Sequence, residues 1–425
     1  MFFTFYNYLK LIIWGSIYFC NFKIYNESNG FLLNILVNNI QNTNPLFIKC
    51  IQKSIPYLKL CNVDKKSVDI LNKVYENNKY HDIDFTLKVY KKDFNDNLND
   101  KYEICELLSS GSIGQVYKIK SKKENNFFAM KVIHPNVNSH IKILKSLYYL
   151  FNLEKYSPFE LDVFLNNFIL ETDFENEAKN MLRFYNFYEN NKSIIIPKLY
   201  EKSKNIIIMD YIDGINIETL DDYEKNKFMT IFILFCNNNK LLLNYNHGDM
   251  HIGNFKKYNN SMVIYDFGCC FESDDKKLPE MVDYTFHNIL KKINLKYNFE
   301  DSINYQIEYH VGKENLHKYK KVINETFFSS KIPDNIEGLI NKVIMFFYKN
   351  KIKIKINFLN LMINYYYTLE YNDVTTLDMA SFCKTYDIFD DYIDYIINNN
   401  FILYRDSEKF EHYNKELADK FKKMI

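Results

Sequence analysis

Glycine is scarce in this chain and is concentrated in one stretch of it. Only 10 of the 425 residues are glycine, about 2% where ~7% is usual. Six of them fall between positions 111 and 268. A chain with so little glycine is expected to keep it where a tight turn or a close ligand contact excludes a side chain. The functional site is therefore expected between these two positions.

The size and composition of the chain limit its architecture and its partners. A length of 425 residues predicts one large bilobal fold or two to three domains. An apolar content of 47% with 25% charged residues predicts a folded chain. The formal net charge of +1 argues against a nucleic-acid-binding protein that depends on bulk charge. The eight cysteines form no C-x-x-C pair, so they are expected to be reduced, mostly buried thiols.

Residues 1–22 are largely apolar, and Lys10 is their one charged side chain. As a helix they would reach about 33 Å, enough to cross a hydrocarbon layer of ~30 Å. A lysine near the middle of such a span is unfavourable, and no small-x-small cleavage site follows. The segment is compatible with a membrane anchor, with an interfacial helix and with a buried helix of the fold.

Apolar periodicity divides the next part of the chain into helical and strand-rich segments. Residues 31–60 have helical periodicity, with Asn44 as a cap and Pro45 at the first position of a helix. Residues 102–133 contain three alternating stretches separated by two turns, which predicts an antiparallel meander. Helical periodicity returns at residues 141–190.

The second half of the chain is predicted to be mostly helical. A pair of short strands is expected at residues 194–212, ending at Asp213-Gly214. From residue 221 onward helices are expected, apart from one hairpin at residues 255–265. We find no internal repeat.

The segment SSGSIGQVY lies between two expected strands at residues 109–117. Its glycines, Gly111 and Gly114, would let backbone N–H groups approach phosphate oxygens. A glycine hairpin alone is weak support for a phosphate site. Lys131 follows Gly114 by seventeen residues within an apolar run, where an unpaired ammonium is costly. This lysine is therefore expected to have an anionic partner.

The strongest motif is HGDMHIGN at residues 247–254, followed by the tripeptide DFG that begins at Asp266. Asp249, Asn254 and Asp266 reproduce the order and spacing of the catalytic loop and magnesium site of kinases. The residue types suit this chemistry, because Mg²⁺ prefers oxygen ligands and a carboxylate can orient an attacking hydroxyl.

The motif has two other interpretations. His247, Asp249 and His251 could form a transition-metal cluster, and the whole segment could be structural. The metal cluster would leave Asn254, the DFG tripeptide and Lys131 unexplained, and the phosphoryl-transfer interpretation is preferred to both.

With these motifs in order, the chain resembles the AarF/UbiB, or ADCK-type, atypical kinase family. The alanine-rich loop of the family matches residues 109–117, with two glycines where alanines are usual, and its VAVKV strand matches residues 129–132. Its ExDxxxEA segment is present as ETDFENEA at residues 171–178, and its catalytic loop matches residues 247–254. The resemblance runs from about residue 40 to about residue 275.

The resemblance implies an α+β, two-lobed protein-kinase-like fold. Its small N-lobe would contain an antiparallel sheet, its C-lobe would be mostly helical, and a helical extension would precede both. The expected parts are an apolar segment at 1–22, the extension at 23–100, the N-lobe with a helical insertion at 101–212, and the C-lobe with a C-terminal extension at 213–425.

Carried over position by position, the resemblance assigns roles to several residues. Lys131 would bind the α- and β-phosphates of ATP and pair with Glu177, and Glu171 and Asp173 would be the acidic pair of the family. Asp249 would orient or deprotonate the acceptor. The residues expected to hold Mg²⁺ are Asn254 and Asp266. The residues expected to contact the nucleotide are Ser109, Ser110, Gly111, Ser112, Ile113, Gly114, Gln115, Met209 and Tyr211.

The N-terminal KxGQ motif of the family is only partly present. Lys49 and Gln52 match it, but Ile51 replaces the glycine. In the family, the helix that carries this motif lies over the substrate side of the cleft. A β-branched residue does not allow the close approach that glycine does, so the sequence does not support the same cover in this chain.

The predicted activity is that of a Mg-ATP-dependent atypical kinase or ATPase that transfers the γ-phosphoryl group to a small molecule, a lipid or water. Only ten residues separate Gly268 from Pro279, too few for a peptide-docking platform, so a broad protein kinase is disfavoured. The alternatives are a nucleotide-binding pseudokinase without turnover and a small-molecule phosphotransferase of the aminoglycoside or choline kinase type.

The resemblance also suggests partners and a location. The expected partners are a nucleotide, a lipid or quinone-pathway ligand and a membrane surface, but no nucleic acid. The expected location is membrane-associated and mitochondrial, in quinone or lipid metabolism.

Overall fold

The computed structural model describes most of residues 29–370 and short pieces before them. The described residues are 10, 13–18, 29–43, 48–49, 51–53, 55–56, 64–72, 80–111, 113–150, 152–155, 157, 159–191, 193–289, 299–333 and 336–370. Ser112, Asn44, Pro45 and most of residues 1–22 lie outside them, so the expectations for these positions stay predictions. Within the described part, no helix has the length and apolar character that a membrane crossing requires.

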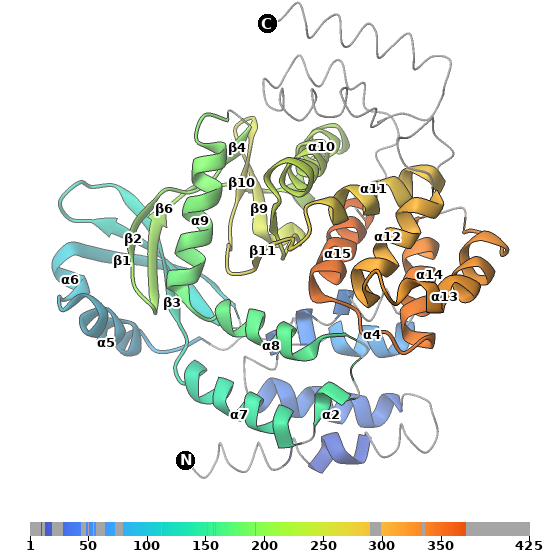
Figure 1. The fold of residues 1–425 in the computed structure, drawn as a ribbon. Coiled ribbons are helices and arrows are strands. Elements are labelled where there is room, and N and C mark those ends of the chain that lie inside the picture. The colour runs from blue at the N-terminus through green and yellow to red at the C-terminus, as the bar shows by residue number, and fades with distance from the viewer. Residues whose placement is uncertain are drawn as a thin grey trace, which may run out of the picture. The chain divides into compact units, whose positions relative to one another are not determined.

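The chain forms two compact units (Figure 1). Unit 1 comprises Met1–Tyr156, Leu161–Tyr185 and Pro197–Ile212, and unit 2 comprises Ser157–Glu160, Asn186–Ile196 and Asp213–Ile425.

Unit 1 contains a five-stranded antiparallel sheet. Its strands are β1 (Tyr102–Ser110), β2 (Gly114–Ser121), β3 (Phe127–Ile133), β5 (Leu199–Lys202) and β6 (Ile206–Asp210), in the order β1-β2-β3-β6-β5. The described helices of this unit include α2 (Gly30–Thr43), α4 (Lys65–Asn72), α5 (Ile83–Phe94), α6 (Leu98–Lys101), α7 (Val137–Leu150), α8 (Leu161–Leu170) and α9 (Phe174–Tyr188).

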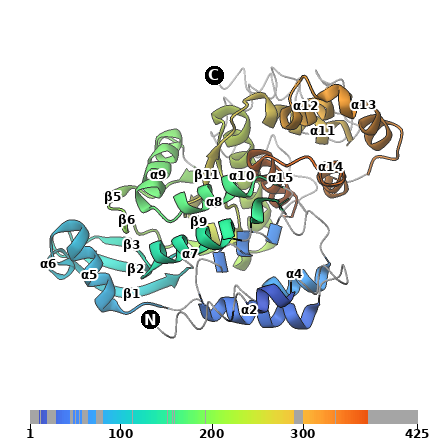
Figure 2. The ribbon, with the colours of Figure 1, turned by 60° about the horizontal axis from the view of Figure 1, so that its bottom comes forward.

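Helices cover both faces of this sheet, because successive residues of a strand point to opposite faces and both sets are apolar. On one face, Tyr90 of α5 joins Tyr117, Met130 and Ile208 of the strands in a buried cluster. Figure 2 shows α5 and α6 beside β1, β2 and β3.

The other face packs against α7, α8 and α9. The cluster there contains Ile133 and Ile207 from the strands together with Phe168, Phe174 and Ala178 from the helices. This packing fixes the start of α9 against β3, where the first half of the candidate site lies.

Unit 2 combines two small sheets with helices. Its strands are β4 (Ile194–Ile195), β7 (Ile215–Asn216), β8 (Tyr245–His247), β9 (Phe255–Tyr258), β10 (Ser261–Ile264) and β11 (Cys270–Glu272). One sheet has the order β4-β10-β9-β7, and β8 pairs with β11 in the other. The longer described helices of the unit are α10 (Asp222–Asn238), α11 (Lys277–Ile289), α12 (Phe299–Val311), α13 (Leu316–Ile323), α14 (Ile336–Lys349) and α15 (Ile356–Glu370).

The α+β fold class is confirmed, with one sheet-based unit and one mostly helical unit. The meander is present as β1–β3, and the predicted hairpin is present as β9–β10. The strand expected from residue 194 is divided: β5 pairs with β6, whereas β4 pairs in parallel with β10. Three strands were not predicted, β7, β8 and β11, and each is only two or three residues long.

Candidate active site

Lys131 lies within β3 and forms an ion pair with Glu177 on α9. Its Nζ donates to Oε1 and Oε2 of Glu177 at 2.7 and 2.8 Å. The lysine side chain is 14% exposed and the glutamate side chain 5%. The centre of the Phe174 ring lies 5.2 Å from the same Nζ. The predicted anionic partner of Lys131 is confirmed, and the contact to both carboxylate oxygens gives a strong, oriented pair.

Asp173 places Glu177 by capping α9. Its Oδ1 accepts a hydrogen bond from the backbone N–H of Glu175 at 3.0 Å, and its carbonyl accepts from the N–H of Glu177 at 3.1 Å. This is the N-cap arrangement that satisfies the free donors of a first helical turn. Phe174, Glu177 and Ala178 then share the buried face of the helix. Asp173 of the predicted acidic pair is therefore a helix cap in this structure.

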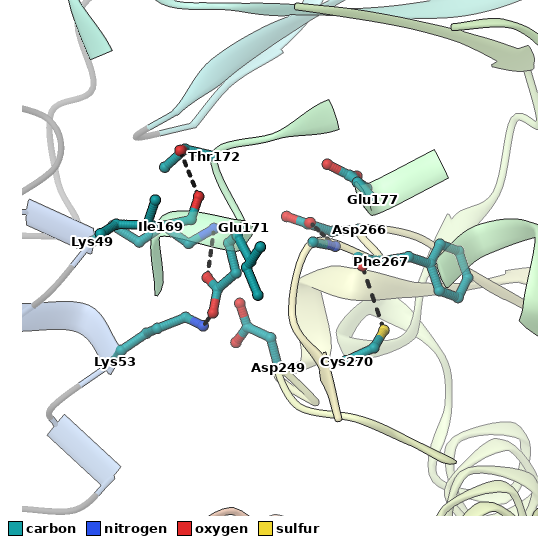
Figure 3. A network of polar contacts seen from close by, with 12 residues as sticks. Lys49, Lys53, Ile169, Glu171, Thr172, Glu177, Asp249, Asp266, Phe267 and Cys270 are labelled. Atoms are coloured by element: carbon teal, nitrogen blue, oxygen red, sulfur yellow. Dashed lines mark hydrogen bonds and ion pairs between the residues drawn. The ribbon is translucent and has the colours of Figure 1, made fainter. Parts of the chain in front are cut away.

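Glu171, the other member of that pair, is buried and bound by two lysines (Figure 3). Lys49 Nζ lies 3.5 Å from Oε2, and Lys53 Nζ pairs with Oε1. The two lysines are four residues apart in a helical stretch, so they lie on one face of it. Lys49 was singled out by the partial KxGQ motif, and Gln52 lies in the same stretch. Lys53 was missed, although its spacing from Lys49 is a signal that could have found it.

The strand register shows which side chains share the face of the sheet that carries Lys131. In the strand register Lys131 is opposite Val116, and Ala129 is opposite both Lys118 and Met209. Residues opposite one another in adjacent strands point to the same face, and so do alternate residues along one strand. The structure thus brings Met209 to the face that carries Lys131.

Tyr211 follows directly after β6 and is held by Lys118. The Nζ of Lys118 lies 4.3 Å from the centre of the Tyr211 ring and 4.9 Å from the centre of the Phe127 ring. These are cation–π distances. The ring of Tyr211 is therefore placed near the β2–β3 side of the sheet.

The turn between β1 and β2 leads into Gly114, where a side chain would collide with β3. A Cβ at Gly114 would lie 2.4 Å from the carbonyl oxygen of Val132, a backbone atom that cannot move aside. A Cβ at Gly111 would meet nothing closer than 3.6 Å. The N–H of Gly111 donates to the carbonyl of Gly114 at 2.9 Å and closes the turn.

The side chain of Gln115 is engaged away from the face of Lys131. Its Oε1 accepts from the N–H of His81 at 2.9 Å, and its Nε2 donates to the His81 carbonyl at 3.2 Å and to the Tyr117 hydroxyl. Gln115 is completely buried. The expectation that Gln115 faces the nucleotide is corrected for its side chain, and only its backbone is left for such a contact.

In unit 2, His247 ends β8 and organises the HGD segment. Its Nε2 donates to the Tyr265 carbonyl at 3.2 Å, and its Nδ1 accepts from the N–H of Asp249 at 3.3 Å. Burial lowers the pKa of this ring, although Asp249 and Asp266 act in the opposite direction. Because backbone groups bind both ring nitrogens, the geometry disfavours the transition-metal cluster of His247, Asp249 and His251.

Asp249 and Asn254 are joined through the loop backbone. The Nδ2 of Asn254 donates to the carbonyl of Asp249 at 2.8 Å. The carbonyl of Asn254 accepts from the N–H of Tyr265 at 2.8 Å, and Asp266 is the next residue. His251 caps the short turn before Asn254, because its Nδ1 accepts from the N–H of Gly253 at 3.2 Å. These bonds bring the three predicted acid and amide side chains into one loop cluster.

Asp266 has a strained backbone. Its φ of 54° lies in the left-handed region, which a residue other than glycine seldom adopts. Its Oδ1 accepts from the N–H of Gly268 at 3.3 Å, while the neighbouring Phe267 is almost fully buried and anchors the turn. Strain of this kind persists where the surroundings fix the conformation, and it is concentrated at functional sites.

These side chains suit a hard divalent cation. Asp266 offers a carboxylate, and Asn254 has its amide nitrogen bound to the loop, which leaves Oδ1 as its ligand atom. Oxygen donors of these two types are those that Mg²⁺ takes, with water filling the other positions. The donor set therefore fits the predicted metal.

Comparison with known proteins identifies the family. A profile of the ABC1 atypical kinase-like domain matches residues 76–296, just over half of the chain. The chain belongs to this ABC1 atypical kinase-like family. The match covers Lys131 and Glu177 in unit 1 as well as Asp249 and Asp266 in unit 2, and it confirms the AarF/UbiB resemblance.

Several curated relatives match part of the chain. A chloroplastic aarF domain-containing protein kinase of Arabidopsis thaliana, itself uncharacterised, is 26% identical over 175 residues, which are 38% of this chain and 25% of the relative. The probable serine/threonine-protein kinase abkB of Dictyostelium discoideum is 28% identical over 44% of this chain and 31% of its own length. A mitochondrial ABC1 family protein of Saccharomyces cerevisiae is 25% identical over 53% of this chain and 41% of its own length.

The chain thus matches less than half the length of each of these relatives. Among solved structures, a Mycobacterium tuberculosis protein in complex with erythromycin aligns with a TM-score of 0.44 and 14% identity, over 73% of this chain and 86% of that chain.

Proposed function

We propose that this protein binds Mg-ATP and acts as an atypical kinase or ATPase. The observation that carries the proposal is the buried pair of Lys131 and Glu177, with nitrogen–oxygen distances of 2.7 and 2.8 Å. Phosphate-binding lysines of kinases are held in this way by a glutamate. Lys131 would contact the α- and β-phosphates, and the backbone of residues 109–115 would cover them.

The loop cluster of unit 2 would supply the groups that bind the metal and orient the acceptor. Asn254 Oδ1 and the Asp266 carboxylate would hold Mg²⁺, which, when bound, neutralises charge that develops on the phosphate oxygens. Asp249 would orient the acceptor hydroxyl or water and take its proton. The hydrogen bonds of His247 and Asn254 to the Asp249 backbone support this role, because they fix the position from which the carboxylate acts.

The acceptor is proposed to be a small molecule, a lipid or water rather than a broad range of proteins. The stretch after Gly268 is short and leads through β11 directly into α11, which begins at Lys277. Relatives are described as chloroplastic or mitochondrial, which supports a location in an organelle. The family resemblance adds the proposal of a membrane-associated role in quinone or lipid metabolism.

The replacement Asp266→Asn tests the metal assignment. Asparagine tolerates the left-handed backbone at this position, so the fold should persist while the negative metal ligand is lost. We expect Mg-ADP to raise the melting temperature of the wild type but not that of the variant. The control is Asp222→Asn in the exposed first turn of α10, which should respond as the wild type does.

An equal Mg-dependent stabilisation of the Asp266→Asn variant would contradict the metal assignment. Steady-state ATP hydrolysis, measured on the same proteins with and without liposomes, separates an enzyme from a pseudokinase. Clear nucleotide binding with hydrolysis and phosphoryl transfer at background would favour the pseudokinase.

A further inference from the structure

Two histidines meet behind the turn that connects β1 and β2, and the proposed function uses neither of them. His81 immediately precedes the cap of α5, and His134 follows β3. Their Nδ1 atoms are 2.8 Å apart, and their rings are nearly perpendicular, at 88°. His134 is 5% exposed.

His134 holds three residues of the turn. Its Nε2 lies 2.9 Å from the carbonyl oxygen of Gly111 and 3.3 Å from the hydroxyl of Ser110. Its backbone N–H donates to the carbonyl of Ile113 at 2.7 Å. One residue therefore ties both its side chain and its backbone to the segment that would cover the phosphates.

The hydrogen bonds fix the protonation of both rings. The Gly111 carbonyl can only accept, so Nε2 of His134 carries its proton and the neutral ring must accept at Nδ1. His81 consequently donates from Nδ1, and its Nε2 accepts from the Thr86 hydroxyl at 2.9 Å. The Thr86 oxygen accepts in turn from the Tyr117 hydroxyl at 3.0 Å.

Gln115 completes this chain at the other end of the turn. Its Nε2 donates to the Tyr117 hydroxyl, so that hydroxyl has its own proton available for Thr86. The donors thus run in one direction, from Gln115 through Tyr117, Thr86 and His81 to His134 and then to the loop carbonyl. A second proton on His134 would place two N–H donors against each other, and a second proton on His81 would break the hydrogen bond that its Nε2 accepts from Thr86.

We propose that His134, oriented by His81, is a positioning residue that fixes the Gly111 carbonyl and so holds the turn between β1 and β2 in the conformation that approaches nucleotide phosphates. This inference rests on the proposed function. A turn held in its binding conformation loses less conformational entropy when ligand binds. The pair therefore acts on affinity for phosphates and not for the nucleoside.

The surroundings keep the pair neutral. Burial lowers the pKa of His134, and burial followed by the neighbouring His134 lowers that of His81 to about 4. Asp82 is the one charged group that opposes this for His81, while the side chains that face the pair from α5, β2 and the turn are Thr86, Tyr117 and Ser110, which are uncharged. The hydrogen bond by which the pair holds the Gly111 carbonyl, called the anchor below, is therefore constant at neutral pH and is lost only in acid.

The test compares His134→Leu with His134→Gln. Leucine removes the donor to Gly111, whereas glutamine keeps an N–H that can reach the same carbonyl. The dissociation constants of Mg-ADP and of adenosine are measured by calorimetry at pH 7.5. We expect leucine to weaken Mg-ADP about tenfold, the factor that corresponds to the loss of about one hydrogen bond, with adenosine unchanged. Glutamine should recover part of the loss, and the exposed His317→Gln should have no effect.

Equal weakening of both ligands, or no weakening of either, would overturn the inference. Two measurements without nucleotide separate it from the proposed function. Nitrogen NMR of the wild type should show His81 as the Nδ1–H tautomer and His134 as the Nε2–H tautomer. Amide exchange at Gly111 and Gly114 should be faster in His134→Leu than in the wild type.

A wild type that binds neither ligand would defeat the proposed function, and the tautomers and the exchange then decide whether the anchor exists. Reversed tautomers or unchanged exchange would overturn the anchor whatever the nucleotide data show. If the leucine variant does not fold, the glutamine variant and the wild-type tautomers still test whether His134 holds the turn.

Discussion

The charges of Lys131 and Glu177 compensate each other, because both side chains are largely buried and water solvates neither of them well. A buried ion pair contributes little to stability compared with an apolar pair of similar volume, whereas removing one member leaves an unpaired charge. A stabilising effect therefore does not explain the pair, whereas the phosphate-binding role proposed for Lys131 would.

This view predicts a specific pattern of stability changes. Lys131→Met should lower the free energy of unfolding by about 3 kcal/mol or more, because the Glu177 carboxylate stays buried without a partner. The double variant Lys131→Met, Glu177→Met should recover most of that loss. Urea unfolding of the two single variants and the double variant measures the coupling. Additive losses in the double variant would contradict the prediction.

The HGD segment depends on a close contact between two short strands. The N–H of Gly248 donates to the carbonyl of Cys269 at 2.7 Å, and β8 pairs with β11 immediately beside it. A Cβ at Gly248 would lie 2.6 Å from the Sγ of Cys269. The position of Asp249 in the site is thus set by the backbones of two elements that approach closely.

The replacement Gly248→Ala should therefore be destabilising by about 1–3 kcal/mol, the usual cost of overpacking. The clash is with a side chain, so adding Cys269→Ala should restore most of the stability. Thermal and urea unfolding of the single and double variants provide the measurement, and Cys269→Ala alone is the control. No rescue in the double variant would show that the constraint comes from another neighbour.

Elements with a long repeating pattern could be predicted, and those defined by a partner strand could not. The three strands of the meander have seven to nine residues each, so their alternation is visible in the sequence. β7, β8 and β11 have two or three residues, too few for a period. Their strand geometry comes from pairing with residues distant in the chain.

The same distinction holds for the candidate site. The motifs identified Lys131 and the loop residues of unit 2, because the chemistry fixes residue type and spacing. Glu177 was assigned only through the ExDxxxEA segment of the family, since 46 residues separate it from Lys131. The motifs did not show that Asp173 caps a helix or that the side chain of Gln115 is bound to His81, since these roles depend on local backbone geometry. Lys53 lies outside the family motifs and its partner Glu171 is 118 residues away, so only its four-residue spacing from Lys49 pointed to it.

At the scale of the whole molecule, one histidine in each unit predicts sensitivity to acid. The pKa of His81 is lowered to about 4, chiefly by burial. The pKa of His310 is lowered to about 3, again chiefly by burial, with the Gln306 carbonyl acting in the opposite direction. An unfolded histidine titrates near pH ~6.5. Below that pH the unfolded chain binds more protons than the folded chain, so stability falls as pH falls toward about 4.

We therefore expect stability to be fully present above pH ~6.5 and to decline below it by up to about 1.4 kcal/mol per pH unit for each histidine. His310→Phe should reduce this decline, because phenylalanine binds no proton. Its ring should fit the site, since the centre of the His310 ring lies 4.1 and 4.8 Å from the ring centres of Phe347 and Phe358. Urea unfolding at pH 8 and pH 5 gives the comparison, with the exposed His317→Gln as control. An undiminished difference between the two pH values would contradict the assignment to His310.

The amines of Lys49 and Lys53 have a consequence for how the protein can be shortened. The family profile begins at residue 76, so a fragment cut there would discard both amines and retain Glu171, an acid that is 4% exposed. Without the two amines, this carboxylate would lose both of its ion pairs. The segment that the family profile matches therefore depends on residues outside it for both ion pairs of Glu171.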